Sequence, residues 1–232
     1  VFFFASAYDN SAFAANRPDV SASSIPIPKG IRQALLSEHS EYWLEAIYTE
    51  YHSILSHNVF EVVRRVDVPT GSNVMRCHCI FTCKSNSDGS IERFKCRCVC
   101  DGNTQVHGLD FDEIFSTVFK FSTFRMALHI AAARDYNITS VDISTAFLYG
   151  SIDVEAYMQM PEGLPRYDAD GYELVCRLLK SIYGLKQAPR IWFNHFRQSL
   201  IEFGFTQSTV DPCLFIFKRN STTMYALLWV DD

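Results

Sequence analysis

Apolar residues recur along this chain first at helical and then at strand spacing, and this change divides its first half into elements. Over residues 40–57 they follow a helical period, and Glu41 and Glu45 stand in the first turns, where the helix dipole favours negative charge. Asn58 is a suitable residue to end this helix. The pattern therefore predicts a helix here and a strand in the β-rich run Val59–Val63.

Two longer strand-like runs follow, Arg76–Lys84 and Ile91–Cys100. They are joined by Ser85–Ser90, which contains an Asp-Gly pair, the commonest signal for a tight turn between strands. We therefore predict a β-hairpin over this region.

The second half of the chain mixes helical and strand patterns. Residues 122–136 read as a helix with Ser122 as its N-cap, and a short strand is expected at Ile138–Ile143. A helix over 189–203 begins with proline, which suits a first turn, and is closed by Gly204. Further short strands are expected at 156–160, 174–178, 214–217 and 224–230. This mixture predicts an α+β fold.

Composition narrows the class of protein. With 232 residues and 48% hydrophobic residues, the chain can bury one or two cores, and residues 1–30 read as a flexible lead-in. No run of 18 apolar residues is present, so we expect no membrane-spanning helix and no membrane partner. The net charge of −5 differs from the basic charge that is typical of nucleic-acid-binding proteins. Between Arg166 and Arg219, however, eight basic residues stand against five acidic ones, which permits a polyanionic partner.

The most informative chemistry is an acidic pair, Asp231 and Asp232, directly after the apolar run Ala226–Val230. Two carboxylates about 4 Å apart repel by roughly 4 kcal/mol at an effective dielectric near 20, and a divalent metal is the usual compensator. Asp142, in the β-type run Ser140–Ile143, supplies a third carboxylate. One Asp on one strand and a pair on another is what a two-metal phosphoryl-transfer site needs.

Cysteines give a competing hypothesis. Six of the eight lie in the predicted hairpin, at positions 77, 79, 83, 96, 98 and 100, and each strand places its three on one face. With His78 nearby they could form a zinc-binding interaction module. The usual C-x₂-C spacing is absent, so small buried core residues are the favoured interpretation.

Several motifs follow one another along the chain: Asp88–Lys95 with Arg97, Phe111–Val118, Val141–Gly150 continuing to Tyr157–Gly163, Leu179–Arg190, and Trp229–Asp232. In order and spacing they resemble the reverse transcriptase domain of copia-type LTR retrotransposons. The resemblance covers roughly residues 40–232. It implies a right-hand polymerase over residues 31–232 that is truncated before the thumb, with fingers at about 57–119 and 150–187 and an incomplete palm at about 120–149 and 188–232.

The resemblance also implies the metal ligands. Asp142 and Asp231 would be the main ligands of two Mg²⁺ ions, with Mn²⁺ as an alternative, and Asp232 would be the third acid. The main-chain carbonyl of Ile143 would complete the set. The alternative for Asp142 taken by itself is an ordinary strand-end residue.

The family further implies residues that handle the nucleotide. They are Lys84, Lys95, Arg97, Phe147, Tyr183, Gly184, Lys186 and Gln187. The basic residues of the hairpin would close on the triphosphate, and Phe147 would act as a steric gate against a 2′-hydroxyl. Solvated strand residues and an ordinary core phenylalanine are the respective alternatives.

The implied partners are an RNA or DNA template with its primer, deoxynucleoside triphosphates, and neighbouring integrase and RNase H domains of a Pol polyprotein, in a cytoplasmic particle or the nucleus. The sequence departs from the family at Asp101, where a basic residue is usual, and at Trp229 and Tyr149. These changes leave a non-catalytic degenerate remnant as the alternative. We also expect the 232-residue chain to be inactive by itself.

Overall fold

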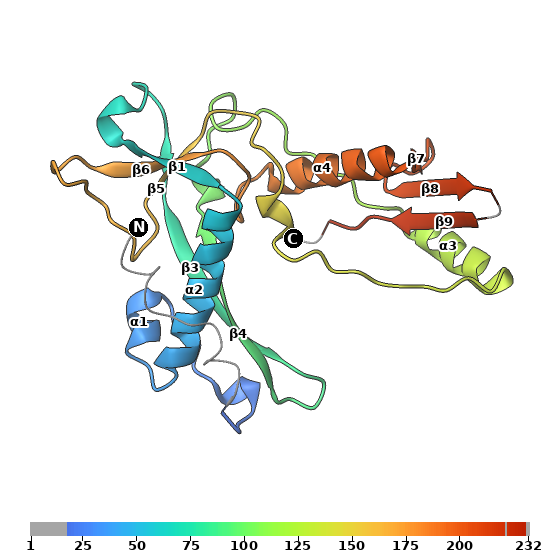
Figure 1. The fold of residues 1–232 in the computed structure, drawn as a ribbon, viewed down its shortest axis with the longest axis horizontal. Coiled ribbons are helices and arrows are strands. Elements are labelled where there is room, and N and C mark those ends of the chain that lie inside the picture. The colour runs from blue at the N-terminus through green and yellow to red at the C-terminus, as the bar shows by residue number, and fades with distance from the viewer. Residues whose placement is uncertain (1–17, 221, 231–232) are drawn as a thin grey trace.

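The computed structural model describes residues 18–220 and 222–230, which form two lobes joined side by side (Figure 1). The large lobe contains α1 (Ile31–Leu35), α2 (Ser40–Ser56), β1 (Phe60–Arg64), β2 (Val74–Met75), β3 (Cys77–Ser85), β4 (Ile91–Cys100), β5 (Tyr157–Gln159) and β6 (Leu174–Leu178). The small lobe contains α3 (Phe121–Ala133), α4 (Ala188–Phe203), β7 (Thr206–Gln207), β8 (Leu214–Arg219) and β9 (Thr222–Leu227). Short 3₁₀ turns are η1 (Ala22–Ser24), η2 (Arg65–Asp67), η3 (Gly102–Thr104) and η4 (Ala146–Leu148). The mixture of helix and sheet agrees with the predicted α+β class.

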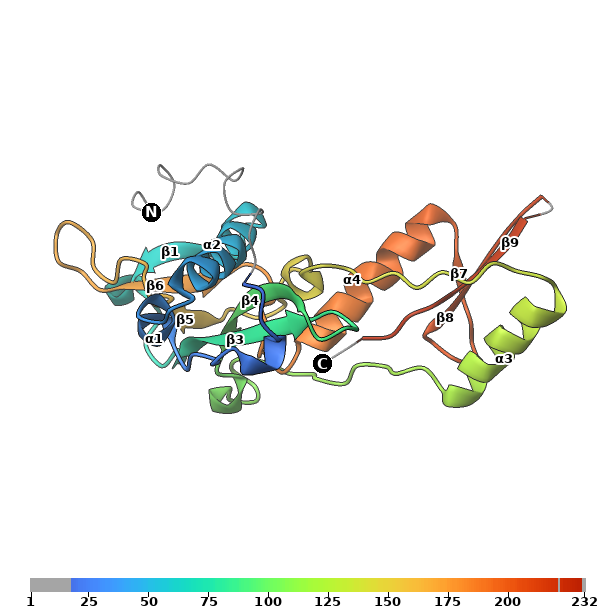
Figure 2. The same ribbon diagram turned by 90° about the horizontal axis from the view of Figure 1, so that it is seen from below.

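The two lobes are interleaved in sequence. Because α3 lies between β4 and β5 in the chain, the backbone leaves the large lobe after β4, returns for β5 and leaves again with α4 (Figure 2). The connecting segments therefore run between the lobes. No helix within the described ranges is long and apolar enough to cross a membrane.

The large lobe is built on a four-stranded sheet and a separate hairpin. The sheet has the order β1-β6-β5-β2, with β1 and β5 antiparallel to β6, and β2 parallel to β5. The hairpin pairs β3 with β4, and α2 packs along β4. Side chains from all these elements, buried except for the half-buried Phe60 of β1, form one continuous core, which also takes in Ala22 and Ile25. The described part of the expected lead-in, residues 18–30, is thus packed against the lobe.

The prediction for α2 is confirmed. Trp43, Ile47 and Ile54 are almost fully buried at helical spacing, so one face of the helix covers the core. The helix ends at Ser56, and Asn58 adopts a positive φ of 52°, a conformation that asparagine tolerates better than most residues.

The predicted hairpin is confirmed as well. Its turn closes through a bond from the Asn86 N–H to the Ser90 carbonyl oxygen at 2.9 Å, and Gly89 takes a φ of +84°. The Asp-Gly signal therefore marks the turn because glycine alone adopts this conformation without strain.

In the small lobe, the predictions of α4 and of the β8–β9 strand pair are also confirmed. Gly204 ends α4 in the left-handed conformation, at a φ of +112°. The helix packs Trp192 and Phe193 onto Phe215 of β8 to make a second apolar core. Strand β9 ends at Leu227, three residues earlier than predicted.

Two local predictions are wrong. Residues 138–143 form no strand, and Ile138 and Val141 are 67% and 77% exposed, because no described strand lies alongside to pair with them. Ser122 is not an N-cap, because α3 already begins at Phe121. The Asp211 carboxylate from a distant segment accepts the Lys120 N–H at 2.9 Å and so takes over the capping role.

Candidate active site

A cleft of about 1530 Å³ is lined by residues of both lobes. Its walls come from α2 and β4 in the large lobe and from α3 and β9 in the small lobe. Residues 135–147, which connect α3 to η4, contribute to the lining together with Tyr183. The cleft is therefore the place where the separate sequence motifs can meet.

Six of the predicted site residues line this cleft together. They are Lys95, Arg97, Asp142, Ile143, Phe147 and Tyr183. They come from β4, from the 135–147 segment, from η4 and from the segment before α4, so only the tertiary fold brings them to one place.

Asp142 is exposed to the cleft, while its neighbour Ile143 is half-buried. Ile143 packs in the same apolar cluster as Leu228 and Val230. Val230 is the last described residue, and Asp231 and Asp232 lie outside the described residues. The chain thus brings the sequence neighbour of Asp142 and the sequence neighbour of Asp231 into one cluster.

A row of cations forms the wall contributed by β4. Lys95 and Arg97 alternate with the buried Cys96 and Cys98, so both point to the face opposite the core. Burial lowers the pKa of Lys95, and the positive charges of Arg97 and its neighbours lower it further. Mutual repulsion of this kind is relieved when an anion binds between the cations.

Tyr183 links this wall to Phe147. The Arg97 guanidinium lies 5.0 Å from the centre of the Tyr183 ring, a cation–π contact. The Phe147 ring meets the Tyr183 ring edge-on, with centroids 5.4 Å apart and an interplanar angle of 71°. Burial and the negative charge of Glu50 raise the pKa of Tyr183, so its hydroxyl stays protonated near neutral pH.

The other four predicted nucleotide residues lie outside the cleft lining. Lys84 is exposed on β3, opposite Arg93 in the hairpin register. Gln187 is fully buried, and its amide donates to the Asp110 carbonyl oxygen at 2.9 Å and accepts from Gln105 at 2.9 Å. Gln187 is thus held inside the protein by its hydrogen bonds.

Lys186 and Gly184 also make contacts within the protein. The Lys186 ammonium lies 4.8 Å from the centre of the Phe111 ring. Gly184 has a φ of +90°, and a Cβ there would overlap the Cys100 carbonyl oxygen. The glycine therefore allows a close approach of two backbones, since the Cys100 N–H also donates to the Tyr183 carbonyl oxygen at 2.8 Å.

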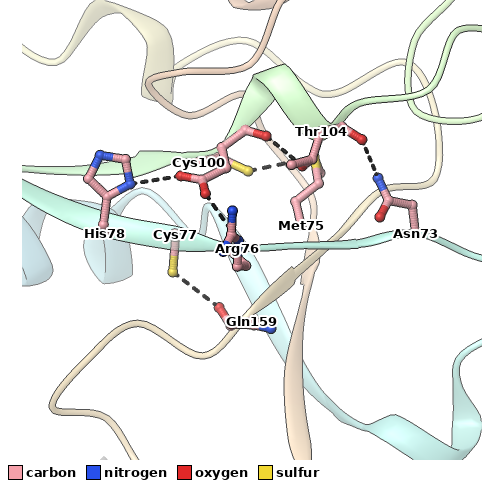
Figure 3. Close-up of polar contacts among 9 residues, drawn as sticks. Asn73, Met75, Arg76, Cys77, His78, Cys100, Thr104 and Gln159 are labelled. Carbon is pink, nitrogen blue, oxygen red and sulfur yellow. Dashed lines mark hydrogen bonds and ion pairs between the residues drawn. The ribbon is translucent and has the colours of Figure 1, made fainter.

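The cysteines of the hairpin lie on its core face, as the strand spacing predicted. Cys79, Cys96, Cys98 and Cys100 are at most 5% exposed. Figure 3 shows that the half-buried Cys77 thiol points to the Gln159 carbonyl oxygen, while the Cys100 thiol contacts the Met75 sulfur. Within residues 18–220 and 222–230, no group of three or more His, Cys, Asp or Glu side chains is arranged to hold a metal ion.

His78 is directed away from these thiols. Its Nδ1 lies 2.7 Å from Oδ1 of Asp101, and the other carboxylate oxygen, Oδ2, lies 3.4 Å from Nε of Arg76. Asp101, one of the departures from the family pattern, is therefore used in a surface cluster with two basic side chains.

Sequence reasoning missed two cleft residues, Arg93 and Glu50. Arg93 continues the period-two row of cations on β4, and this alternation was a usable signal. Glu50 occupies a buried position on α2, only 7% exposed, between Ile47 and Ile54. A charged residue inside the apolar stripe of a helix was the signal in this case.

The arrangement combines oxygen ligands with cations across one cleft. The carboxylate of Asp142 is the kind of ligand that Mg²⁺ prefers, and Arg97 can offer two parallel N–H groups to a phosphate. Such a site suits a phosphate-bearing substrate that arrives with divalent cations.

Comparisons with known proteins point to one family. Residues 58–232 match a family described as reverse transcriptase (RNA-dependent DNA polymerase). The chain is 37% identical over 211 residues to the retrovirus-related Pol polyprotein from transposon RE2 of Arabidopsis thaliana, which covers 91% of this chain and 14% of that protein. It is 37% identical to the corresponding polyprotein from transposon RE1 of the same plant, covering 87% of this chain and 13% of the relative.

A third relative is the retrovirus-related Pol polyprotein from transposon TNT 1-94 of Nicotiana tabacum, at 35% identity, with 88% of this chain and 15% of the relative covered. The chain thus spans about one-seventh of the length of these curated relatives. No solved structure matches it.

Proposed function

Because the chain belongs to the reverse transcriptase (RNA-dependent DNA polymerase) family of retrotransposon Pol polyproteins, we propose that its cleft is the active site of an RNA-directed DNA polymerase. Such an enzyme joins a deoxynucleotide to the 3′-hydroxyl of a primer. The observation that carries this proposal is the apolar cluster shared by Ile143 and Val230, the neighbours of Asp142 and Asp231. Ile143 also lines the cleft that contains the cations of β4.

The acids would hold the metal ions. Asp142, Asp231 and Asp232, with the main-chain carbonyl of Ile143, offer only oxygen ligands, which fit two Mg²⁺ ions. When bound, the ions would lower the pKa of the primer hydroxyl and neutralise charge on the departing pyrophosphate. The chain contributes position and charge, which phosphoryl transfer needs more than a dedicated acid or base.

The β4 wall would bind the triphosphate. Arg97 is braced against Tyr183 at 5.0 Å, so its guanidinium is held toward the cleft, and Lys95 adds a second cation. Phe147 contacts Tyr183 and would lie beneath the sugar as a steric gate. Lys84 would extend the same basic face of the hairpin. Gly184, Lys186 and Gln187 would act indirectly, by fixing the segment that carries Tyr183.

The lobes support a division into fingers and palm. The large lobe would form the fingers and the small lobe the palm, since the chain changes lobes near the expected boundaries at residues 120, 150 and 187. A template–primer duplex would lie across the cleft, and integrase and RNase H domains would accompany the domain in a Pol polyprotein.

Equilibrium binding of dTTP in the presence of poly(rA)/oligo(dT) and Mg²⁺ tests the proposal. Asp142→Asn should weaken Mg²⁺-dependent binding at least about tenfold, because it removes a charged metal ligand. The matched control is Asp135→Asn, an acid that lines the same cleft. Binding that is independent of Mg²⁺, or lost equally in both variants, would contradict the proposal.

Extension of oligo(dT) on the same template is the direct readout of turnover. Extension by the 232-residue chain that disappears in Asp142→Asn would establish the polymerase reaction and would overturn the expectation that this chain is inactive by itself.

A further inference from the structure

Glu50 is a buried carboxyl group that the proposed reaction does not use. It lies on α2 with 7% of its surface exposed, and it lines the same cleft as Lys95 and Arg97. Its Oε1 accepts the backbone N–H of Cys98 at 2.9 Å. A carboxyl group at such a position needs a physical reason, because burying a charge is costly unless it is paired.

The bond to Cys98 shows what Glu50 does to the strand. Among the described strands β4 pairs with β3 alone, so the N–H groups on its other edge need acceptors from outside the sheet. The Cys98 N–H is taken by Glu50, and the Cys100 N–H is taken by the Tyr183 carbonyl oxygen. Glu50 and the Tyr183 carbonyl group therefore hold the outer edge of β4 by one hydrogen bond on each side of Val99.

These two hydrogen bonds fix the direction of the Lys95 and Arg97 side chains. Arg97 immediately precedes Cys98, so the strand cannot rotate at Arg97 without breaking the bond to Glu50. Lys95 lies two residues earlier on the same face. The carboxyl of Glu50 is therefore coupled to both cations through the backbone as well as through charge.

The groups that face Glu50 are cations, thiols and a phenol. They are Lys95, Arg97 and Cys96 of β4, Cys79 of β3, and Tyr183. Burial raises the pKa of Glu50 to about 7, and the Cys98 N–H, Arg97 and Lys95 oppose this rise. The carboxyl group is thus near the midpoint of its titration at neutral pH.

We propose that Glu50 is a positioning residue that holds Lys95 and Arg97 toward the cleft and that takes up a proton when an anionic triphosphate binds them. This inference rests on the proposed function of the cleft. In the free protein the Glu50 carboxylate partly neutralises the two cations. An arriving triphosphate makes the surroundings of Glu50 more negative, which favours the neutral acid. The neutral acid still accepts the Cys98 N–H through its carbonyl oxygen and leaves both cations to the phosphates.

The sign of the pH dependence follows from linkage. Because binding raises the pKa of Glu50, the protonated form binds the triphosphate better, so affinity falls as the pH rises above 7. At pH 7 the protein should take up a fraction of a proton, at most about one half, for each triphosphate bound.

Calorimetric titration of the 232-residue chain with Mg²⁺–dTTP, in the presence of poly(rA)/oligo(dT), tests the inference. Titration at pH 7 in two buffers of different ionisation enthalpy gives the number of protons taken up. Glu50→Gln keeps the acceptor for Cys98 but cannot titrate, so it should abolish the uptake and bind about three- to tenfold more tightly than the wild type at pH 8. The two proteins should bind equally at pH 6.

Glu45→Gln is the matched control. Glu45 lies on the same helix and lines the same cleft, and its carboxylate makes no hydrogen bond within the described residues. It should leave the proton uptake unchanged. Because Glu50→Gln is isosteric, its melting temperature at pH 6 shows whether the fold is intact. Glu50→Ala, which also removes the acceptor, should bind more weakly than Glu50→Gln at pH 6.

The outcomes separate this inference from the proposed function. A wild-type chain that binds no Mg²⁺–dTTP overturns both. Tight binding with the same proton uptake in wild type and Glu50→Gln overturns only the role of Glu50. Uptake that is lost in Glu50→Gln and kept in Glu45→Gln supports both.

Discussion

The guanidinium of Arg97 lies 5.0 Å from the centre of the Tyr183 ring, and this contact joins the two parts of the sequence that handle phosphate in the proposed site. Arg97 belongs to β4, whereas Tyr183 precedes α4. The contact orients the cation without neutralising it, because an aromatic face attracts a cation but carries no net charge. An arginine held in this way keeps its whole positive charge for binding an anion.

Replacing Arg97 by lysine should weaken the binding of Mg²⁺–dTTP about three- to tenfold. Lysine keeps the charge but loses the planar fork and most of the stacking, which together are worth about 1 kcal/mol. Titration of labelled nucleotide gives the dissociation constants. Arg93→Lys on the same face of β4 is the control, and an equal loss in both variants would show that the contact with Tyr183 is unimportant.

Gly184→Ala should destabilise the fold by roughly 2 kcal/mol or more, since it adds both an unfavourable φ and an overlap with the Cys100 carbonyl oxygen. Urea denaturation followed by circular dichroism gives the free energy of unfolding. Gly171→Ala is the matched control, because Gly171 has a φ of +86° with open space around its position. A similar loss in both variants would mean that backbone strain, and not the approach to β4, accounts for the effect.

Asp211→Asn should lower the free energy of unfolding by about 1–2 kcal/mol at pH 7, because one carboxylate caps α3 and also accepts the Cys213 N–H at 3.0 Å. Burial alone would raise the pKa of Asp211. Hydrogen bonds from Thr123, Lys120 and Cys213 outweigh it, so the pKa is below its usual value.

The pH dependence of this effect follows from that depressed pKa. The stabilisation by the Asp211 carboxylate is complete above the unfolded pKa of about 4 and is lost as the pH falls through the folded value. Thermal melts of wild type and variant should therefore converge at low pH. The exposed Asp112, changed to asparagine, should leave the melting curve unchanged at every pH.

Cys98→Ser should destabilise the chain by about 1–3 kcal/mol, because it places a hydroxyl among apolar neighbours at a site that is 1% exposed. A chelator should leave the melting temperature of the wild type unchanged, as expected for core thiols. Cys83→Ser, at a half-buried position, is the milder control. Stoichiometric zinc that is lost in Cys98→Ser would instead favour the interaction module.

Much of the local structure could be read from the sequence because it depends on local pattern. The buried face of α2, the turn at Asp88-Gly89 and the end of α4 at Gly204 follow from helical spacing and from the freedom of glycine. The N-cap of α3 could not be read in this way. Its partner, Asp211, is 91 residues away from Lys120 along the chain, and no local pattern reports such a contact.

In the candidate site, too, some features could be read from the sequence and others depend on the tertiary fold. Asp142, Phe147, Lys95, Arg97 and Tyr183 were identified from motifs and line one cleft. Lys186 and Gln187 stand in the same motif as Tyr183 but are engaged with Gln105 and Asp110. A motif states which residues occur together, whereas the direction of each side chain depends on the backbone into which it packs.

By itself, the sequence determined the family and the α+β class and suggested the chemistry that we propose for the cleft, because residue type and spacing carry that information directly. The tertiary structure alone decided that Glu50 fastens β4 beside Arg97 and that residues 138–143 stay unpaired among the described residues. Both depend on which distant segment lies alongside, and a backbone N–H is satisfied by whatever acceptor the fold brings within reach.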